Sequence, residues 1–134
     1  MRPKMRVYNG DPLKYAHVKY DGHYLEVRSR DSGVIEYASR LDTLLDLAWV
    51  PTLKNAYRAK HLMPILGELW YPGQPASYVK TAIKNRDGGL QFSVFAMRCP
   101  DDTLESLHDM CLLYGLQSIP FYGGTDKYSS GRLG

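Results

Sequence analysis

The feature that most restricts the fold of this chain is an alternating pattern over residues 22–30. Polar or amphipathic side chains alternate there with a second set that is mostly apolar: Tyr24, Glu26 and Arg28 against Leu25, Val27 and Ser29. Because successive side chains of a β-strand point to opposite faces, this period of two predicts a half-buried strand. Asp31-Ser32-Gly33 is a turn signal, and residues 34–38 are again β-prone. We therefore predict a β-hairpin.

The remaining chain shows interspersed strand and helix patterns. We expect further strands over residues 5–9, 13–20, 62–71, 90–97 and 119–122. Helices are expected in two short pieces across 42–60, where leucines recur and Pro51 interrupts, and again over 76–84 and 102–114. Because tight turns join the early strands, the sheet should be mainly antiparallel, with flanking helices. The predicted fold class is α+β.

Composition restricts the class of protein further. The chain has 134 residues, of which 44% are hydrophobic and 23% charged, as expected of one globular domain. It lacks the run of roughly 20 apolar residues that spans a bilayer, and no hydrophobic region follows the basic first residues. We therefore expect a cytoplasmic protein without a membrane partner. The net charge of +3 is compatible with a polyanionic partner.

Cysteine and histidine give no metal signature. The two cysteines, Cys99 and Cys111, are expected to be free thiols, although a disulfide between them is the alternative. The four histidines are scattered and show no zinc spacing with the cysteines. We expect no structural metal.

The strongest candidate for chemistry is the lysine in His17-Val18-Lys19-Tyr20-Asp21-Gly22. An apolar environment lowers the pKa of a lysine, because desolvation disfavours the ammonium form, and the neutral amine is a nucleophile. Asp21 is placed to orient that amine, and Gly22 permits a backbone geometry that a side chain forbids. The alternative is a surface strand end with a lysine–aspartate pair and a turn glycine.

Three further residues follow in order along the chain. Arg40 ends the predicted hairpin and offers a planar fork of donors for a phosphate or ribose; alternatively, it is a solvated arginine. Glu68 interrupts an apolar strand, where it faces either a cleft, as a ligand of ribose or metal, or water at a sheet edge. Phe95 either stacks on a purine or packs in the core.

Taken in this order, the motifs resemble those of the covalent nucleotidyltransferase superfamily. The closest similarity is to the adenylation domain of ATP-dependent DNA ligases, particularly the small phage and bacterial kind, over roughly residues 13–122. The matching segments are Lys19-Tyr20-Asp21-Gly22, Ser39-Arg40, Gly67-Glu68-Leu69 and Val94-Phe95-Ala96-Met97. The resemblance implies a ligase-type nucleotidyltransferase fold, related to ATP-grasp, that is incomplete in this chain.

The same resemblance implies an activity and a set of site residues. Lys19 takes AMP from ATP as a phosphoramidate, with Mg²⁺ as cofactor, for sealing nicked double-stranded DNA in repair or replication. The nucleotide-binding residues implied are His17, Val18, Asp21, Gly22, Arg40, Glu68 and Phe95. Glu68 is also the candidate metal ligand.

The sequence departs from the family pattern at several points. His17 and Leu66 stand where the family usually has acidic residues, and the family's later Glu-Gly-(apolar)-(apolar)-Lys and Lys-x-Lys segments are missing. We therefore expect a partial adenylation domain over residues 1–122, followed by a flexible tail over 123–134. One alternative is a non-catalytic remnant that binds a nucleotide, a nucleic acid or a protein. Another is a relative of the RNA ligases.

Overall fold

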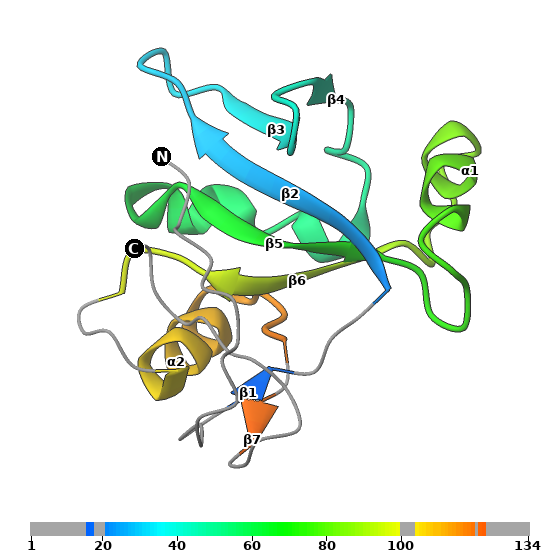
Figure 1. Ribbon diagram of the computed structural model, residues 1–134. Coiled ribbons are helices and arrows are strands. Elements are labelled where there is room, and N and C mark those ends of the chain that lie inside the picture. The colour runs from blue at the N-terminus through cyan, green and yellow to red at the C-terminus, as the bar shows by residue number, and fades with distance from the viewer. Residues whose placement is uncertain (1–15, 18–20, 100–103, 120, 123–134) are drawn as a thin grey trace.

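The computed structural model describes residues 16–17, 21–99, 104–119 and 121–122 (Figure 1). Its strands are β1 (Ala16–His17), β2 (Gly22–Ser29), β3 (Ile35–Ser39), β4 (Leu44–Leu45), β5 (Ile65–Trp70), β6 (Gln91–Ala96) and β7 (Phe121–Tyr122). The 3₁₀-helices are η1 (Pro51–Leu53) and η2 (Ala56–Leu62), and the α-helices are α1 (Tyr78–Lys84) and α2 (Leu104–Tyr114). The α+β prediction is confirmed.

A five-stranded antiparallel sheet in the order β4-β3-β2-β5-β6 forms the centre of the fold. The predicted hairpin is confirmed as β2 and β3, in which Val27 lies opposite Tyr37. β5 pairs with the other edge of β2 and places Glu68 opposite Tyr24. β1 and β7 form a separate antiparallel pair. The long central strand β2 therefore pairs with a neighbouring strand along each of its edges.

The two faces of this sheet have different surroundings. Leu25 and Val27 point into the main core, with Leu69 and Phe92 of the neighbouring strands. Buried residues of η1, η2, α1 and α2 complete that core: Leu53, Ala56, Ala59, Val79, Ala82, Leu107 and Cys111. In Figure 1 the segment 51–62 passes behind β5 and α2 lies beside β6. The alternation of β2 turns the other set, which includes Tyr24 and Glu26, to the opposite face.

The prediction of a helix beginning near residue 42 is wrong for its first half. Leu44–Leu45 form a short strand paired with β3, and helical structure begins only at Pro51. Ser39 causes the difference, because its Oγ accepts a hydrogen bond from Thr43 N (3.1 Å) and its backbone N donates to Thr43 O (2.9 Å). These bonds close a tight turn, so the leucines that follow return along β3. Pro51 is the first residue of η1. At this position a backbone N–H would have no partner within the helix, so proline loses no hydrogen bond there.

An irregularity in the β5–β6 pairing affects which face Phe95 reaches. The register shifts between Leu66, which lies opposite Ala96, and Gly67, which lies opposite Val94. Phe95 is the extra residue on β6, as in a β-bulge. Val94 packs in the main core, whereas Phe95 packs with Leu66 in a second small cluster that Tyr24 joins. The bulge thus brings an aromatic side chain to the Tyr24 side of the sheet.

We predict that Gly67→Ala destabilises the fold. A Cβ at Gly67 would collide with the carbonyl oxygen of Ser93 and lie 2.7 Å from the ring of Phe92, both in the neighbouring strand. Overpacking of this kind costs about 1–3 kcal/mol. Denaturant titration should show that loss, whereas Gly88→Ala, with nothing within 4 Å of the new Cβ, should change the unfolding free energy by less than about 0.5 kcal/mol. Equal effects of the two substitutions would contradict the close approach.

Candidate functional site

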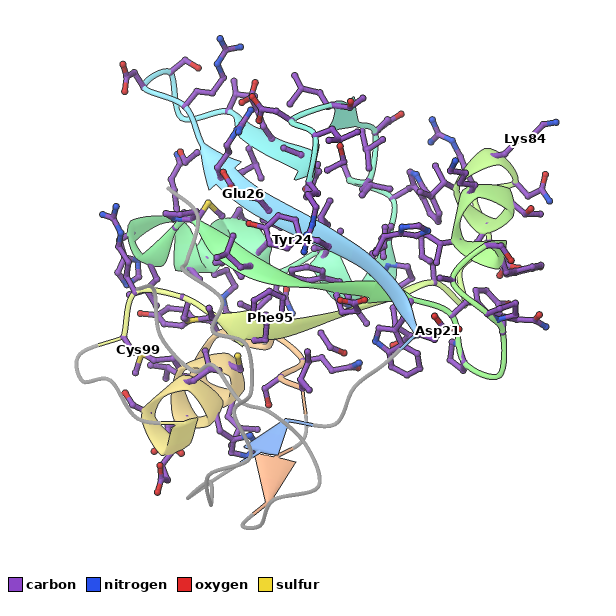
Figure 2. The ribbon with its side chains drawn as sticks, viewed as in Figure 1. Asp21, Tyr24, Glu26, Lys84, Phe95 and Cys99 are labelled. Carbon is purple, nitrogen blue, oxygen red and sulfur yellow. The ribbon has the colours of Figure 1, made fainter. Side chains whose placement is uncertain are left out.

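The candidate site is organised around Tyr24, on the face of the sheet opposite the main core. The guanidinium carbon of Arg40 lies 5.5 Å from the centre of the Tyr24 ring. The ring centre of Phe95 lies 6.2 Å from that of Tyr24, with the planes tilted by 51°. Glu68 is the cross-strand partner of Tyr24 and so shares its face. Three residues far apart in the sequence therefore meet at one tyrosine, which Figure 2 shows beside Phe95 near the middle of the sheet.

Each of these three residues offers different chemistry. Arg40 is exposed and presents a permanent positive charge with planar donors. Glu68 is half-buried and presents an acceptor. Phe95 is only 8% exposed, so most of its surface packs against the second small cluster, and what remains forms a wall beside Tyr24. A cation, a carboxylate and an aromatic wall together suit a polar ligand that carries a phosphate, hydroxyls and a flat ring.

The lysine motif lies only partly within the described residues. Lys19 and Val18 are outside them, and the backbone of His17 pairs with Phe121 in the β1–β7 ladder. Asp21 is exposed and directly precedes β2 (Figure 2). Because Lys19 precedes Gly22 by three positions, the motif leads directly into the strand that carries Tyr24.

Gly22 has a role different from the expected turn. It is the first residue of β2 and pairs with Trp70, and its φ angle is not in the left-handed region. A Cβ at this position would collide with the carbonyl oxygen of Leu69 and lie 2.8 Å from Cβ of Trp70. The glycine is therefore needed for close approach of β2 and β5, a geometry that a side chain would prevent, and the alternative of a turn glycine is wrong.

A buried hydroxyl fixes the strands beside Glu68. Ser93 lies opposite Glu68 on β6 and is fully buried. Its Oγ accepts a hydrogen bond from Trp70 Nε1 at 2.9 Å and another from Gln117 Nε2 at 2.7 Å. These bonds join β5, β6 and the segment after α2. The backbone that carries Glu68 is thereby held on both sides.

An arginine network supports the turn that carries Arg40. Arg28 on β2 donates from Nε to Glu36 (3.2 Å) and from Nη1 to Asp42 (2.6 Å), and its Nη1 also lies 3.4 Å from Glu26. Asp42 has a φ of 66°, an uncommon value for a residue other than glycine. The Asp42 carboxylate, followed by Glu36 and Glu26, raises the pKa of Arg28 above its ordinary value. The network ties β2, β3 and the Arg40 turn together.

The described residues contain no group of three histidine, cysteine or acidic side chains that would hold a metal ion. Glu68 as a metal ligand remains a prediction. Cys99 and Cys111 are free thiols, and burial in the main core raises the pKa of Cys111 to about 12. In the same part of the chain, no helix is long and apolar enough to cross a membrane.

Sequence reasoning identified Arg40, Glu68 and Phe95 but assigned no role to Tyr24. The alternation in residues 22–30 places Tyr24 with the polar side chains of the strand, and this is the sequence signal that could have indicated a role for it. Its neighbours come from three other strand regions, and no local pattern indicates that pairing. Leu66 packs with Phe95 in the small cluster.

Solved structures with a similar fold are known. The chain is similar to an archaeal ATP-dependent RNA ligase, with a TM-score of 0.57 and 20% sequence identity over 83% of this chain. The match covers 31% of that protein, so this chain spans about a third of its length. No protein-family model matches the sequence, and no curated protein does. At this level of identity, the similarity shows that the two proteins share a fold over this region.

We predict that Arg28→Gln lowers the free energy of unfolding by about 1–2 kcal/mol, because it leaves Glu26 without its arginine. Glu26 is only 5% exposed, so water cannot fully replace the lost partner. The matched control is Arg86→Gln, which breaks the exposed ion pair with Asp46 (2.8 Å) and should cost about 0.5 kcal/mol or less. Denaturant titration of both variants measures the difference. Equal losses of unfolding free energy in the two variants would show that the Arg28 network stabilises the fold no more than an exposed ion pair does.

Proposed function

We propose that this chain is part of a ligase-type nucleotidyltransferase that transfers AMP from ATP to Lys19. The observation that carries the proposal is the convergence of Arg40, Glu68 and Phe95 on Tyr24, in the strand that follows the lysine motif. The similarity in fold to an ATP-dependent RNA ligase supports it. Residues 1–122 then form a partial adenylation domain, and residues 123–134 form a tail.

In this mechanism the neutral amine of Lys19 attacks the α-phosphorus of ATP. The N–P bond forms as the bond to the β-phosphate oxygen breaks, and pyrophosphate leaves; the amine gives up its proton to solvent or a base. Asp21 orients the amine, and His17, Val18 and Gly22 line its side of the nucleotide. Arg40 binds phosphate or ribose, Glu68 accepts a hydrogen bond from a ribose hydroxyl, and Phe95 covers the adenine.

A magnesium ion fits this donor set in a limited way. Mg²⁺ is commonly held by one or two carboxylates together with substrate phosphates and water, so Glu68 as the one carboxylate ligand is compatible with it. Glu68 is the residue proposed to hold it, and the ion would neutralise charge on the phosphates.

The polynucleotide substrate separates two versions of the proposal. A DNA ligase relative would pass AMP to the 5′-phosphate of nicked double-stranded DNA, in repair or replication. An RNA ligase relative fits at least as well, because the structural neighbour is an RNA ligase. Sealing assays with matched nicked DNA and nicked RNA substrates would distinguish the two.

A non-catalytic role is the second candidate function. The described site residues favour it, because Arg40, Glu68 and Phe95 meet at Tyr24 and can bind a ligand without a reaction at Lys19. In this version the same face binds a nucleotide, a nucleic acid or a protein without transferring AMP.

We predict that incubation with ATP and Mg²⁺ adds one adenylyl group to the protein, on Lys19. Intact mass spectrometry should detect the adduct in the unmodified chain and in Lys80→Ala, and not in Lys19→Ala. Lys80 is an exposed lysine on α1 and serves as the matched control. If no adduct forms but calorimetry detects ATP binding, the non-catalytic candidate is correct; absence of both would overturn the nucleotide site.

We predict that Tyr24→Leu raises the KM for ATP in adenylation by about two- to five-fold, while Tyr24→Phe leaves it nearly unchanged. Leucine removes the ring on which the Arg40 guanidinium lies, and such contacts are worth about 0.5–1 kcal/mol at exposed sites. Phenylalanine keeps the ring. If the protein does not transfer AMP, the ratio of dissociation constants for ATP provides the same measurement. Equal values for the two variants would exclude Tyr24 as the residue that positions Arg40.

A further inference from the structure

The 3₁₀ segment over residues 53–60 has a burial period of three. Leu53, Ala56 and Ala59 are all at most 2% exposed and belong to the main core. This spacing is the repeat of a 3₁₀-helix, in which side chains at i and i+3 eclipse one another. The burial period continues from the end of η1 through residues 54–55 into η2, although the backbone of Ala59 (φ −103°, ψ 25°) kinks η2.

The adjoining face of this segment is positively charged. Lys54, Tyr57 and Lys60, one position after each buried residue, are all exposed, and Arg58 is exposed beside them. We call these four residues the basic stripe. Lys54 and Lys60 stand at the two ends of this set. Tyr57 lies between them in the sequence and is 64% exposed.

The basic stripe forms no ion pair with the described acidic residues. The sequence has no aspartate or glutamate between Asp46 and Glu68. The ion pairs found among the described residues involve the arginines 28, 30 and 86, and none involves the basic stripe. Nζ of Lys60 lies near the β2–β3 turn, since it would be 2.9 Å from a Cβ at Gly33.

The basic stripe lies on the side of the sheet opposite Tyr24, and it is held firmly. Thr52 Oγ1 accepts a hydrogen bond from the backbone N of Phe92 at 2.8 Å. Asn55 Nδ2 donates to the carbonyl oxygen of Gly115 at 3.3 Å, and His61 Nε2 lies 2.9 Å from the Tyr114 hydroxyl. These contacts fix the segment to β6 and to the end of α2. The exposed side chains therefore project from a scaffold that is already ordered.

From this arrangement we propose that the basic stripe binds a single-stranded nucleic acid. Lys54, Arg58 and Lys60 contact successive phosphates, and a base stacks on the ring of Tyr57. Proteins that bind single strands combine such a positively charged track with aromatic platforms. A duplex keeps its bases stacked inside and offers none to Tyr57. This surface is separate from the proposed nucleotide site, and its binding does not depend on adenylation.

Fluorescence anisotropy with a labelled single-stranded 12-nucleotide oligonucleotide, without ATP, tests the proposal. Lys54→Gln/Lys60→Gln should weaken binding at least ten-fold at low salt and lower the slope of log K against log salt by about 1.4, or about 0.7 per phosphate contact. Tyr57→Ala should weaken binding at least five-fold, and Tyr57→Phe should retain it.

The matched control is Lys80→Gln/Lys84→Gln, which removes the same charge from exposed positions on α1. This variant should lose less than two-fold. Equal losses in the two lysine pairs would show that binding follows net charge alone and would overturn the proposal. Unchanged binding in Tyr57→Ala, or tighter binding of an acidic peptide than of the oligonucleotide, would also overturn it. Circular dichroism of each variant verifies that the fold is retained.

Discussion

The pairing of β2 with both β3 and β5 is the constraint on which the rest of this structure depends. One face of β2 supplies Leu25 and Val27 to the main core, and the other supplies Tyr24 to the candidate site. Because side chains alternate, a register slip of one residue would exchange the two faces. Gly22 and Gly67 allow close approach of the strands, so the hydrophobic pattern and the glycines specify the same register.

Local patterns predicted the hairpin, α1 and α2, which have a clear period and a turn or capping signal, and also β5 and β6, which are mostly apolar, β-prone runs. Two features were not predictable in this way. Leu44 and Leu45 have an apolar pattern that suits a helix as well as a strand, and the Ser39–Thr43 bonds decide between them. Arg40, Glu68 and Phe95 were named as site residues from motif order, but their meeting at Tyr24 depends on sheet topology.

The supports of the candidate site differ in kind. Around Glu68 the backbone is fixed by the buried Ser93 hydroxyl, which two neutral donors satisfy. The turn that carries Arg40 is closed by the Ser39–Thr43 hydrogen bonds and is held in addition by charges, with Arg28 bonded to carboxylates of two strands and of the turn itself. Buried neutral hydrogen bonds are insensitive to salt, whereas partly exposed ion pairs are screened by it. The stability of the Arg40 side of the site should therefore be the more sensitive to salt.

At each edge of the five-stranded sheet, the strand is short or its outward backbone groups are already hydrogen-bonded. This limits the pairing of these edges with strands of another copy of the protein. β4 has only two residues. At the other edge, the backbone N of Phe92 in β6 donates a hydrogen bond to Thr52 Oγ1. The backbone N of Val94 donates to Gln117 O, and the carbonyl oxygen of Val94 accepts from Ile119 N. Exposed strand edges with free hydrogen-bonding groups recruit other chains into extended sheets. Because side chains and a loop already use these groups, the sheet offers little template for growth into aggregates at high concentration.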